Sequence, residues 1–183
     1  YPENNSLGVI TVSGGAGVII SDAADALGLS MPEMPAESQE KLLKLLPYAA
    51  PRNPVDVTAQ YLNQMSLLNT FADTLITEGK YSSILGFFTY TGSAPTIAPR
   101  LREQLKLVRA KHPDCMFVLC VIANREQIRE YENDGFTVFE DPGRAVAAIE
   151  AMGRSFEIVA VDDGSTDDTL PTPQTSYGAQ KHI

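Results

Sequence analysis

The alternation of short apolar segments with longer segments of helical spacing constrains the fold of this chain more than any other feature. Residues 7–12, 83–90 and 115–122 have the composition and length of buried strands. The third of them, CMFVLCVI, is apolar throughout, as expected of a strand in a sheet that is covered on both faces. Residues 136–139 form a shorter segment of the same kind. Strands that alternate with helices in this way form a parallel sheet.

Helices are predicted between these strands, and several have clear end signals. They cover residues 15–27, 38–46 and 65–76, a stretch from the turn at 91–95 to about 111, and residues 124–134 and 141 to about 156. Gly28 fits a C′ glycine, Asn124 and Gln127 fit a capping pair, and Pro142 lies in a first turn. Five apolar residues are expected on one side of the first helix: Val18, Ile19, Ala23, Ala26 and Leu27. With about five strands, the predicted fold is α/β, a flavodoxin-like doubly wound parallel sheet with helices on both faces.

One such domain is predicted, over residues 7–157. Residues 1–6 are expected to be a disordered lead-in, and residues 158–183 an acidic and polar linker or tail, because Thr, Pro, Asp, Gln and Ser dominate there. The stretch YAAPRNPVDVTAQ at 48–60 is expected to be a loop, since its two prolines disfavour a regular element. The polar start without a Met or a signal peptide favours a piece of a longer protein.

Net charge, hydropathy and the cysteines indicate which kinds of partner and which location to expect. The chain has 14 Lys and Arg against 23 Asp and Glu, a net charge of −9, which argues against a nucleic-acid partner. No apolar run reaches the roughly 18 residues of a membrane span, so no membrane partner is expected. Cys115 and Cys120 would point to opposite faces of one strand and so are not expected to pair. Two free thiols are typical of a reducing, cytoplasmic location.

A glycine cluster follows the first predicted strand and opens the first predicted helix. We take Ser13, Gly14, Gly15, Ala16 and Gly17 as a candidate phosphate-binding loop. Ligands of doubly wound sheets bind outside the carboxyl ends of the strands, and the N–H groups and dipole of a helix N-terminus attract anions. The cluster is neither a P-loop nor a GxGxxG motif. The alternative is that its glycines only permit a tight turn.

Two further segments support this candidate site. Thr91, Gly92 and Ser93 follow the strand at 83–90 and offer hydroxyl groups and a second helix N-terminus for a phosphate. Asn53 and Asp56, in RNPVD, lie in the proline-containing loop and are expected to support the site. The alternative for this loop is a structural turn in which Asp56 caps a neighbour. No metal-ligating cluster is predicted.

Taken together, TVSGGAGVIISDAADALGL, LLPYAAPRNPVDVTA and DGFTVFEDPGRAVAAIEAM resemble the NDP-forming acyl-CoA synthetases, the succinyl-CoA synthetase-like superfamily. The resemblance covers roughly residues 6–152 and fits the second flavodoxin-like ligase domain of that family. It implies formation of an acyl-CoA from a carboxylic acid, CoA and ATP or GTP, with Mg in the full-length enzyme and no cofactor held covalently by this chain. A histidine carries the phosphoryl group, and two helix N-termini face it, one of them supplied here by Ser13–Gly17 or by Thr91–Ser93.

The resemblance also implies partners. The histidine-bearing, CoA-binding and ATP-grasp domains of the family are absent from this chain, and neither His112 nor His182 has the setting of the family's phosphorylated histidine. We therefore expect the partners to be other domains or subunits of one ligase, and the isolated domain to have neither a catalytic residue nor activity. His112 is expected to have a surface role.

Two other readings remain open. EIVAVDDGSTDDTL, at 157–170, resembles a strand of nucleotide-sugar glycosyltransferases, but only a short polar stretch follows it. The second alternative is a non-catalytic flavodoxin-like binding or interaction module, for example one that binds FMN against Tyr48 or Tyr90. A yellow purified protein would favour FMN.

Overall fold

A computed structural model describes residues 5–153 of the chain. Six strands form one sheet in the order β2-β3-β1-β4-β5-β6. Five of them are parallel, namely β1 (Leu7–Thr11), β3 (Val55–Asp56), β4 (Ser83–Thr89), β5 (Met116–Val121) and β6 (Thr137–Phe139). The sixth, β2 (Ala50–Pro51), lies antiparallel to β3 at the edge. The parallel strands thus have the flavodoxin-like order, which confirms the predicted fold class.

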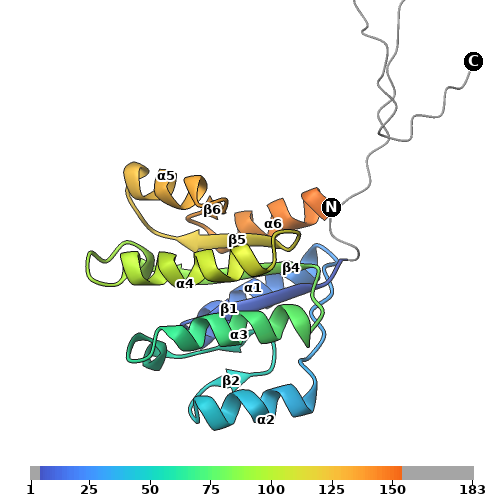
Figure 1. Cartoon of the computed structure of the whole chain (residues 1–183). Coiled ribbons are helices and arrows are strands. Elements are labelled where there is room, and N and C mark those ends of the chain that lie inside the picture. The colour runs from blue at the N-terminus through green and yellow to red at the C-terminus, as the bar shows by residue number, and fades with distance from the viewer. Residues whose placement is uncertain (1–4, 154–183) are drawn as a thin grey trace, which may run out of the picture. The chain divides into compact units, whose positions relative to one another are not determined.

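Helices cover both faces of the sheet (Figure 1). They are α1 (Gly14–Ala26), α2 (Ala36–Leu45), α3 (Ser66–Thr77), α4 (Ala98–Lys111), α5 (Arg125–Asn133) and α6 (Pro142–Gly153), with 3-10 turns η1 (Ala59–Leu62) and η2 (Tyr90–Gly92). Side chains of α1 and α6 share one buried cluster with β1, β4 and β5, and those of α2, α3 and α4 share the other. The core therefore has two layers, one on each side of the sheet.

The end signals read from the sequence are confirmed. The Asn124 side chain accepts a hydrogen bond from the Gln127 N–H, and the Gln127 side chain accepts one from the Asn124 N–H, so the capping box is complete. Gly28 follows α1 with φ +73°, the left-handed conformation of a C′ glycine. Cys115 and Cys120 pack on opposite sides of the sheet, and neither forms a disulfide.

The loop expected at 48–60 contains two short strands, so that prediction was wrong in part. Pro51 lies in the edge strand β2, where alternate residues turn their N–H away from the sheet, and a proline at such a position costs no ladder bond. Pro54 stands just before β3, and Val55 behind it is fully buried and pairs with Ile10. Pro51 is itself paired with Val55, and Pro54 only borders β3, so neither proline prevents the pairing.

The lead-in expected at 1–6 is also too long. The Ser30 N–H donates to the Asn5 carbonyl at 3.0 Å, and Ser6 pairs with Ser30 as an isolated bridge. Asn5 and Ser6 therefore already extend the sheet. The expected end of the last helix near 156, the domain boundary at 157, the linker or tail at 158–183, His182 and the segment EIVAVDDGSTDDTL lie outside the described residues.

The apolar side expected for α1 is not the side that faces the sheet, although Ala23 packs partly against the core. The helix buries its smaller residues and one isoleucine, Ala16, Gly17, Ile20 and Ala24. Val18 and Ile19 point away from the sheet and are 61% and 59% exposed. Because α1 has apolar residues on its outward side as well as on its buried side, spacing alone does not identify the buried face. The small residues decide it, since they allow the helix to approach the sheet closely.

Candidate functional site

The topological switch point of the sheet lies between β1 and β4. These strands are neighbours, and the helices that follow them, α1 and α4, pack on opposite faces. Chain segments therefore diverge at the carboxyl ends of β1 and β4, which is where open α/β sheets bind ligands. Ser13–Gly17 follows β1, η2 follows β4, and Asp56 ends β3 beside them. The topology thus brings the three predicted segments to one edge of the sheet.

Ser13 turns the chain from β1 into α1. It has the extended N-cap conformation, with φ −148° and ψ 117°, but its side chain makes no capping hydrogen bond. The Thr11 hydroxyl holds this turn instead: it accepts from the Ser13 N–H and donates to the Ser13 carbonyl, both at 3.0 Å. The first intrahelical bond runs from the Gly17 N–H to the Ser13 carbonyl at 3.2 Å. The N–H groups of Gly14, Gly15 and Ala16 consequently have no intrahelical acceptor.

The glycines of this loop differ in the structural reason for having no side chain. None has a positive φ, so a left-handed turn explains none of them. A Cβ on Gly17 would lie 3.2 Å from Pro54 Cβ, so this glycine allows α1 to pack against the loop before β3. A Cβ on Gly15 would meet nothing nearer than the Ser13 hydroxyl at 4.0 Å. The tight-turn alternative therefore does not account for Gly15, which lies exposed in the first turn of the helix.

Asp56 adds a negative charge beside this helix end. Its Oδ1 accepts from the Thr58 N–H at 2.7 Å, so it does cap its own turn. Its Oδ2 would lie 3.2 Å from a Cβ on Gly14. A carboxylate next to a helix N-terminus is favourable for the helix, but it repels a second anion on the same side. An anion at this helix end would therefore have to lie toward Gly15, away from Asp56.

Asn53 supports the loop through backbone contacts. Its side chain accepts from the Val9 N–H at 2.9 Å and donates to the Leu7 carbonyl at 3.0 Å and to the Pro32 carbonyl at 3.1 Å. These bonds join β1 to two loops that are distant in sequence. Asn53 thus fixes where Pro54 lies, and Pro54 in turn packs close to Gly17 of α1, where an added Cβ would be crowded at 3.2 Å.

The segment Thr91–Ser93 is engaged in structural contacts. The Thr91 hydroxyl accepts from the Tyr61 hydroxyl at 3.0 Å and donates to the Phe88 carbonyl. The Gly92 carbonyl accepts from the Tyr131 hydroxyl at 2.7 Å, and the Ser93 hydroxyl donates to the Tyr90 carbonyl at 3.2 Å. The helix N-terminus expected here is not at this place, because α4 begins only at Ala98. Of the two candidate helix ends, the structure therefore brings only α1 to the switch point.

Sequence reasoning missed the residues that stiffen this edge. Tyr61, in η1, is fully buried, and burial raises the pKa of its hydroxyl although the Thr91 hydrogen bond opposes the shift. It therefore stays a neutral donor at physiological pH. Thr58 and Thr89 have φ values of 53° and 46°, which are rare for β-branched residues. The sequence signals only the turn at Thr58: in the DVT of 56–58, the Asp56 side chain is spaced to accept from the backbone N–H two residues on.

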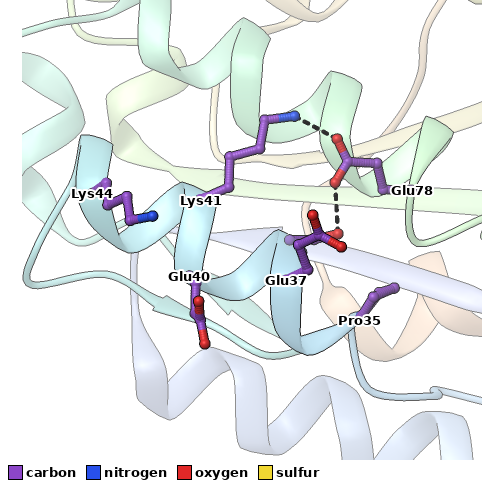
Figure 2. A pocket seen from close by; sticks show the side chains of 7 residues that line it. Pro35, Glu37, Glu40, Lys41, Lys44 and Glu78 are labelled. Carbon is purple, nitrogen blue, oxygen red and sulfur yellow. Dashed lines mark hydrogen bonds and ion pairs between the residues drawn. The ribbon is translucent and has the colours of Figure 1, made fainter.

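Another hollow lies away from the switch point, between α2 and the end of α3 (Figure 2). It has a volume of about 730 Å³ and is lined by Pro35, Glu37, Ser38, Glu40, Lys41, Lys44 and Glu78. The Ser38 hydroxyl donates to Glu78 Oε2 at 2.6 Å, and Lys41 forms an ion pair with the same carboxylate. These two bonds hold the pKa of Glu78 below its usual value, with Lys41 the larger cause. They join α2 to α3, so we assign the hollow a structural role.

His112 ends α4, next to the start of β5 and thus at the opposite end of the sheet from the switch point. Its side chain is only 15% exposed, and its Nε2 lies 2.7 Å from Asp73 Oδ1, which Lys111 Nζ also contacts at 2.7 Å. Burial acts to raise the pKa of Asp73, but these two partners outweigh it and the pKa is lowered. The expected surface role of His112 is corrected to an α3–α4 contact.

Within residues 5–153, no three His, Cys, Asp or Glu side chains are grouped as a metal site would need. The helices described between those residues are too short or too polar to cross a membrane.

Comparisons with known proteins place these observations in a family. The family model for the Ligase-CoA domain matches residues 7–137. Acetate–CoA ligase [ADP-forming] I of Archaeoglobus fulgidus is 28% identical over 165 residues, which are 87% of this chain and 22% of that protein. Acetate–CoA ligase [ADP-forming] II subunit alpha of Pyrococcus furiosus is 28% identical over 160 residues, 82% of this chain and 34% of that subunit. The chain therefore spans only about a fifth to a third of the length of these relatives.

Solved structures show the same fold. A crystal structure of a protein from Pyrococcus horikoshii OT3 superposes with a TM-score of 0.70 at 22% identity, over 82% of this chain and 35% of that one. Dinucleotide-forming acetyl-coenzyme A synthetase 1 of Ca. Korarchaeum cryptofilum, solved in an apo form and with phosphate and ADP, gives a TM-score of 0.66 at 18% identity, over 82% of this chain and 33% of that one. The fold is thus shared, and the family model extends over most of the described domain. This chain belongs to the Ligase-CoA domain family.

Proposed function

We propose that this chain is one domain of an NDP-forming acyl-CoA synthetase, and that the N-terminus of α1 helps to hold a phosphoryl group carried by a histidine of another domain. The overall reaction joins a carboxylic acid to CoA, and ATP or GTP is converted to NDP and phosphate. CoA, the nucleotide and Mg would be bound largely by the other domains. The similarity to ADP-forming acetate–CoA ligases supports the ligase assignment, and it covers only part of those proteins.

The observation that carries the proposal is the set of backbone donors at the first turn of α1. Gly14, Gly15 and Ala16 have N–H groups without intrahelical acceptors, at the carboxyl end of β1. Gly15 has open space where its side chain would be, so a phosphoryl oxygen can approach the backbone there. Phosphoryl transfer depends mainly on positioning and charge stabilisation, which fixed N–H groups supply without moving.

Asp56 would orient the incoming group. Its carboxylate lies beside Gly14 and repels a phosphoryl oxygen on that side. The favourable approach is consequently over Gly15. The Thr11 hydroxyl fixes the turn, and Asn53 fixes the loop that contacts Gly17. Each of these residues acts by holding the helix end in one position.

The histidine would come from another domain. His112 lies at the far end of the sheet, with its Nε2 engaged by Asp73. The proposal therefore predicts that the 183-residue chain alone is not phosphorylated by ATP and does not form acyl-CoA.

The test is reconstitution. The complete ligase, prepared with and without this domain, is given ATP, CoA and a panel of carboxylic acids that includes acetate, and both ADP and acyl-CoA are measured. We expect product only from the complete assembly, and none from the 183-residue chain. Acyl-CoA formation at the same rate without this domain would overturn the proposal. A yellow protein with a flavin spectrum would instead favour the FMN-binding alternative.

A further inference from the structure

The outward side of α1 carries apolar side chains that nothing in the described part of the chain covers. Val18 and Ile19 are 61% and 59% exposed, in a helix whose opposite side is buried against the sheet. Exposed apolar side chains that adjoin one another and are bordered by polar groups are typical of a contact surface. The outward side of α1 therefore has the character of a contact surface.

A groove continues this surface toward the edge of the sheet. Its volume is about 280 Å³. One wall is formed by α1 residues spaced at helical intervals, and the other by the loops around β2 and β3; the lining residues are Thr11, Gly14, Gly17, Val18, Ser21, Ala50, Pro54 and Asp56. Helix and groove together form a surface with an apolar centre, which we call the α1 face and define by Val18, Ile19, Ala50 and Pro54.

The border of the α1 face is acidic. Asp22 and Asp25 follow Val18 at helical spacings that place them on the same side of the helix, and both are exposed. Asp56 lies at the other end, beside Gly14. Helix α1 has no Lys, Arg or His. A partner that fits this surface must therefore bring an apolar centre surrounded by Lys or Arg side chains, since opposite charges at the border guide docking and exclude wrong partners.

We propose that the α1 face docks on another domain of the same ligase, one with an apolar patch bordered by basic residues. This inference rests on the proposed function. The occupant is a ligase domain rather than a second copy for two reasons. The chain spans only 22% and 34% of the curated relatives it matches, so most of their length has no counterpart here to cover a surface. A second copy would bring the same acidic border, and the like charges would repel.

The surface also adjoins the proposed phosphoryl site. Gly15 is exposed on the same outward side of α1 as Val18 and Ile19, one turn earlier. A domain seated on the α1 face would exclude water near Gly15, and so strengthen the interaction of the helix end with an anion. Docking and phosphoryl binding would then depend on each other.

The test uses thiol labelling at Ile19. Ile19→Cys is made in the 183-residue chain and in the complete ligase, and its rate of reaction with a maleimide is measured in both. The native thiols give little background, because burial raises the pKa of Cys115 to about 11 and that of Cys120 to about 12. Leu107→Cys is the matched control, since Leu107 is 52% exposed on α4, on the other side of the sheet.

We expect Ile19→Cys to react at least tenfold more slowly in the complete ligase than in the isolated chain, while Leu107→Cys changes by less. Asp22→Lys with Asp25→Lys should restore the reaction of Ile19→Cys in the complete ligase. Equal labelling of Ile19→Cys in both samples would overturn the proposal. Protection that rises with concentration of the isolated chain, together with a dimer in light scattering, would overturn it in favour of a second copy.

The same samples are assayed for acyl-CoA formation, which keeps the two proposals apart. An active ligase with an unprotected Ile19→Cys means that the docking surface is wrong and the function stands. A protected Ile19→Cys in an assembly that makes no acyl-CoA means that the docking stands and the function is wrong.

Discussion

Substitution of Gly15 distinguishes a phosphoryl-binding role from a structural one. The structure predicts that a side chain at this position keeps or raises the stability of the domain, whereas it lowers the rate of phosphoryl transfer. A Cβ at this position meets nothing closer than the Ser13 hydroxyl at 4.0 Å, and φ is not positive. Gly15→Ala should therefore raise the stability of the domain by about 0.5–1 kcal/mol, since glycine in a helix costs that much relative to alanine. That corresponds to a rise in Tm of roughly 1–4 °C for a domain of this size. Gly15→Val should be close to neutral, because a β-branched residue loses about 0.5 kcal/mol of that gain.

Phosphoryl transfer should move the other way. In the complete ligase, a Cβ at residue 15 would occupy the side from which a phosphoryl oxygen approaches. Loss of one aligned donor typically costs about 3 kcal/mol, or on the order of a hundredfold in rate. We expect Gly15→Val to slow single-turnover formation of phosphohistidine by about this factor while Tm is unchanged.

Gly17→Ala is the matched control for this experiment. Its Cβ would lie 3.2 Å from Pro54 Cβ and 3.4 Å from Pro54 Cγ. We expect it to be destabilising by about 1 kcal/mol or more, because overpacking outweighs the gain in helix propensity. The reasoning is refuted if Gly15→Val unfolds as readily as Gly17→Ala, or if it forms phosphohistidine at the wild-type rate per folded molecule.

Three further substitutions test the packing, capping and ion pairs of the fold. Gly92→Ala places a Cβ 2.4 Å from Val121 Cγ1, so it should lower stability by ~1–3 kcal/mol in thermal unfolding, and a wild-type Tm would show that η2 has another position. Asn124→Ala removes the capping box of α5 and should cost about 1 kcal/mol in urea unfolding, whereas Asn133→Ala at the end of the same helix should cost less. Because the pKa of Asp73 is lowered in the folded state, its carboxylate stabilises the domain above the usual pKa of 3.8, and this contribution is lost as pH falls through the lower folded value. Asp73→Asn should thus be less stable than wild type at pH 7, by about 1 kcal/mol or less, and the gap should narrow toward pH 3; a gap independent of pH would contradict this.

Much of the fold follows from local signals in the sequence. The continuous apolar run at 115–122 predicts a doubly covered strand, and the Asn124 and Gln127 pair predicts the start of α5 within a residue. These predictions hold because each depends on residues close together in the chain. The two prolines at 51 and 54 misled the prediction, since whether a proline is tolerated depends on the strand's place in the sheet. That place is set by contacts distant in sequence, such as Asn53 with β1.

The candidate site was predictable only in part. The position of Ser13–Gly17 after a strand and before a helix follows from the pattern, and the structure bears out that placement. The expectation for Thr91–Ser93 assumed that a helix begins directly after the strand, but a 3-10 turn and a loop intervene before Ala98. The placement of Asp56 beside Gly14 and the outward direction of Val18 both depend on the tertiary structure. No spacing within a single segment predicts them.

The central claim, that the first turn of α1 binds a phosphoryl group on an imidazole, is tested most directly by NMR. The 183-residue chain, labelled with 15N, is titrated with phosphoimidazole at constant ionic strength, with imidazole alone as the control. We predict that phosphoimidazole, and not imidazole, shifts the amides of Gly14, Gly15 and Ala16 in a saturable manner, and that Gly15→Val abolishes these shifts. Shifts confined to Thr91–Ser93, shifts scattered over the surface, or no shift at the first turn of α1 would contradict the claim.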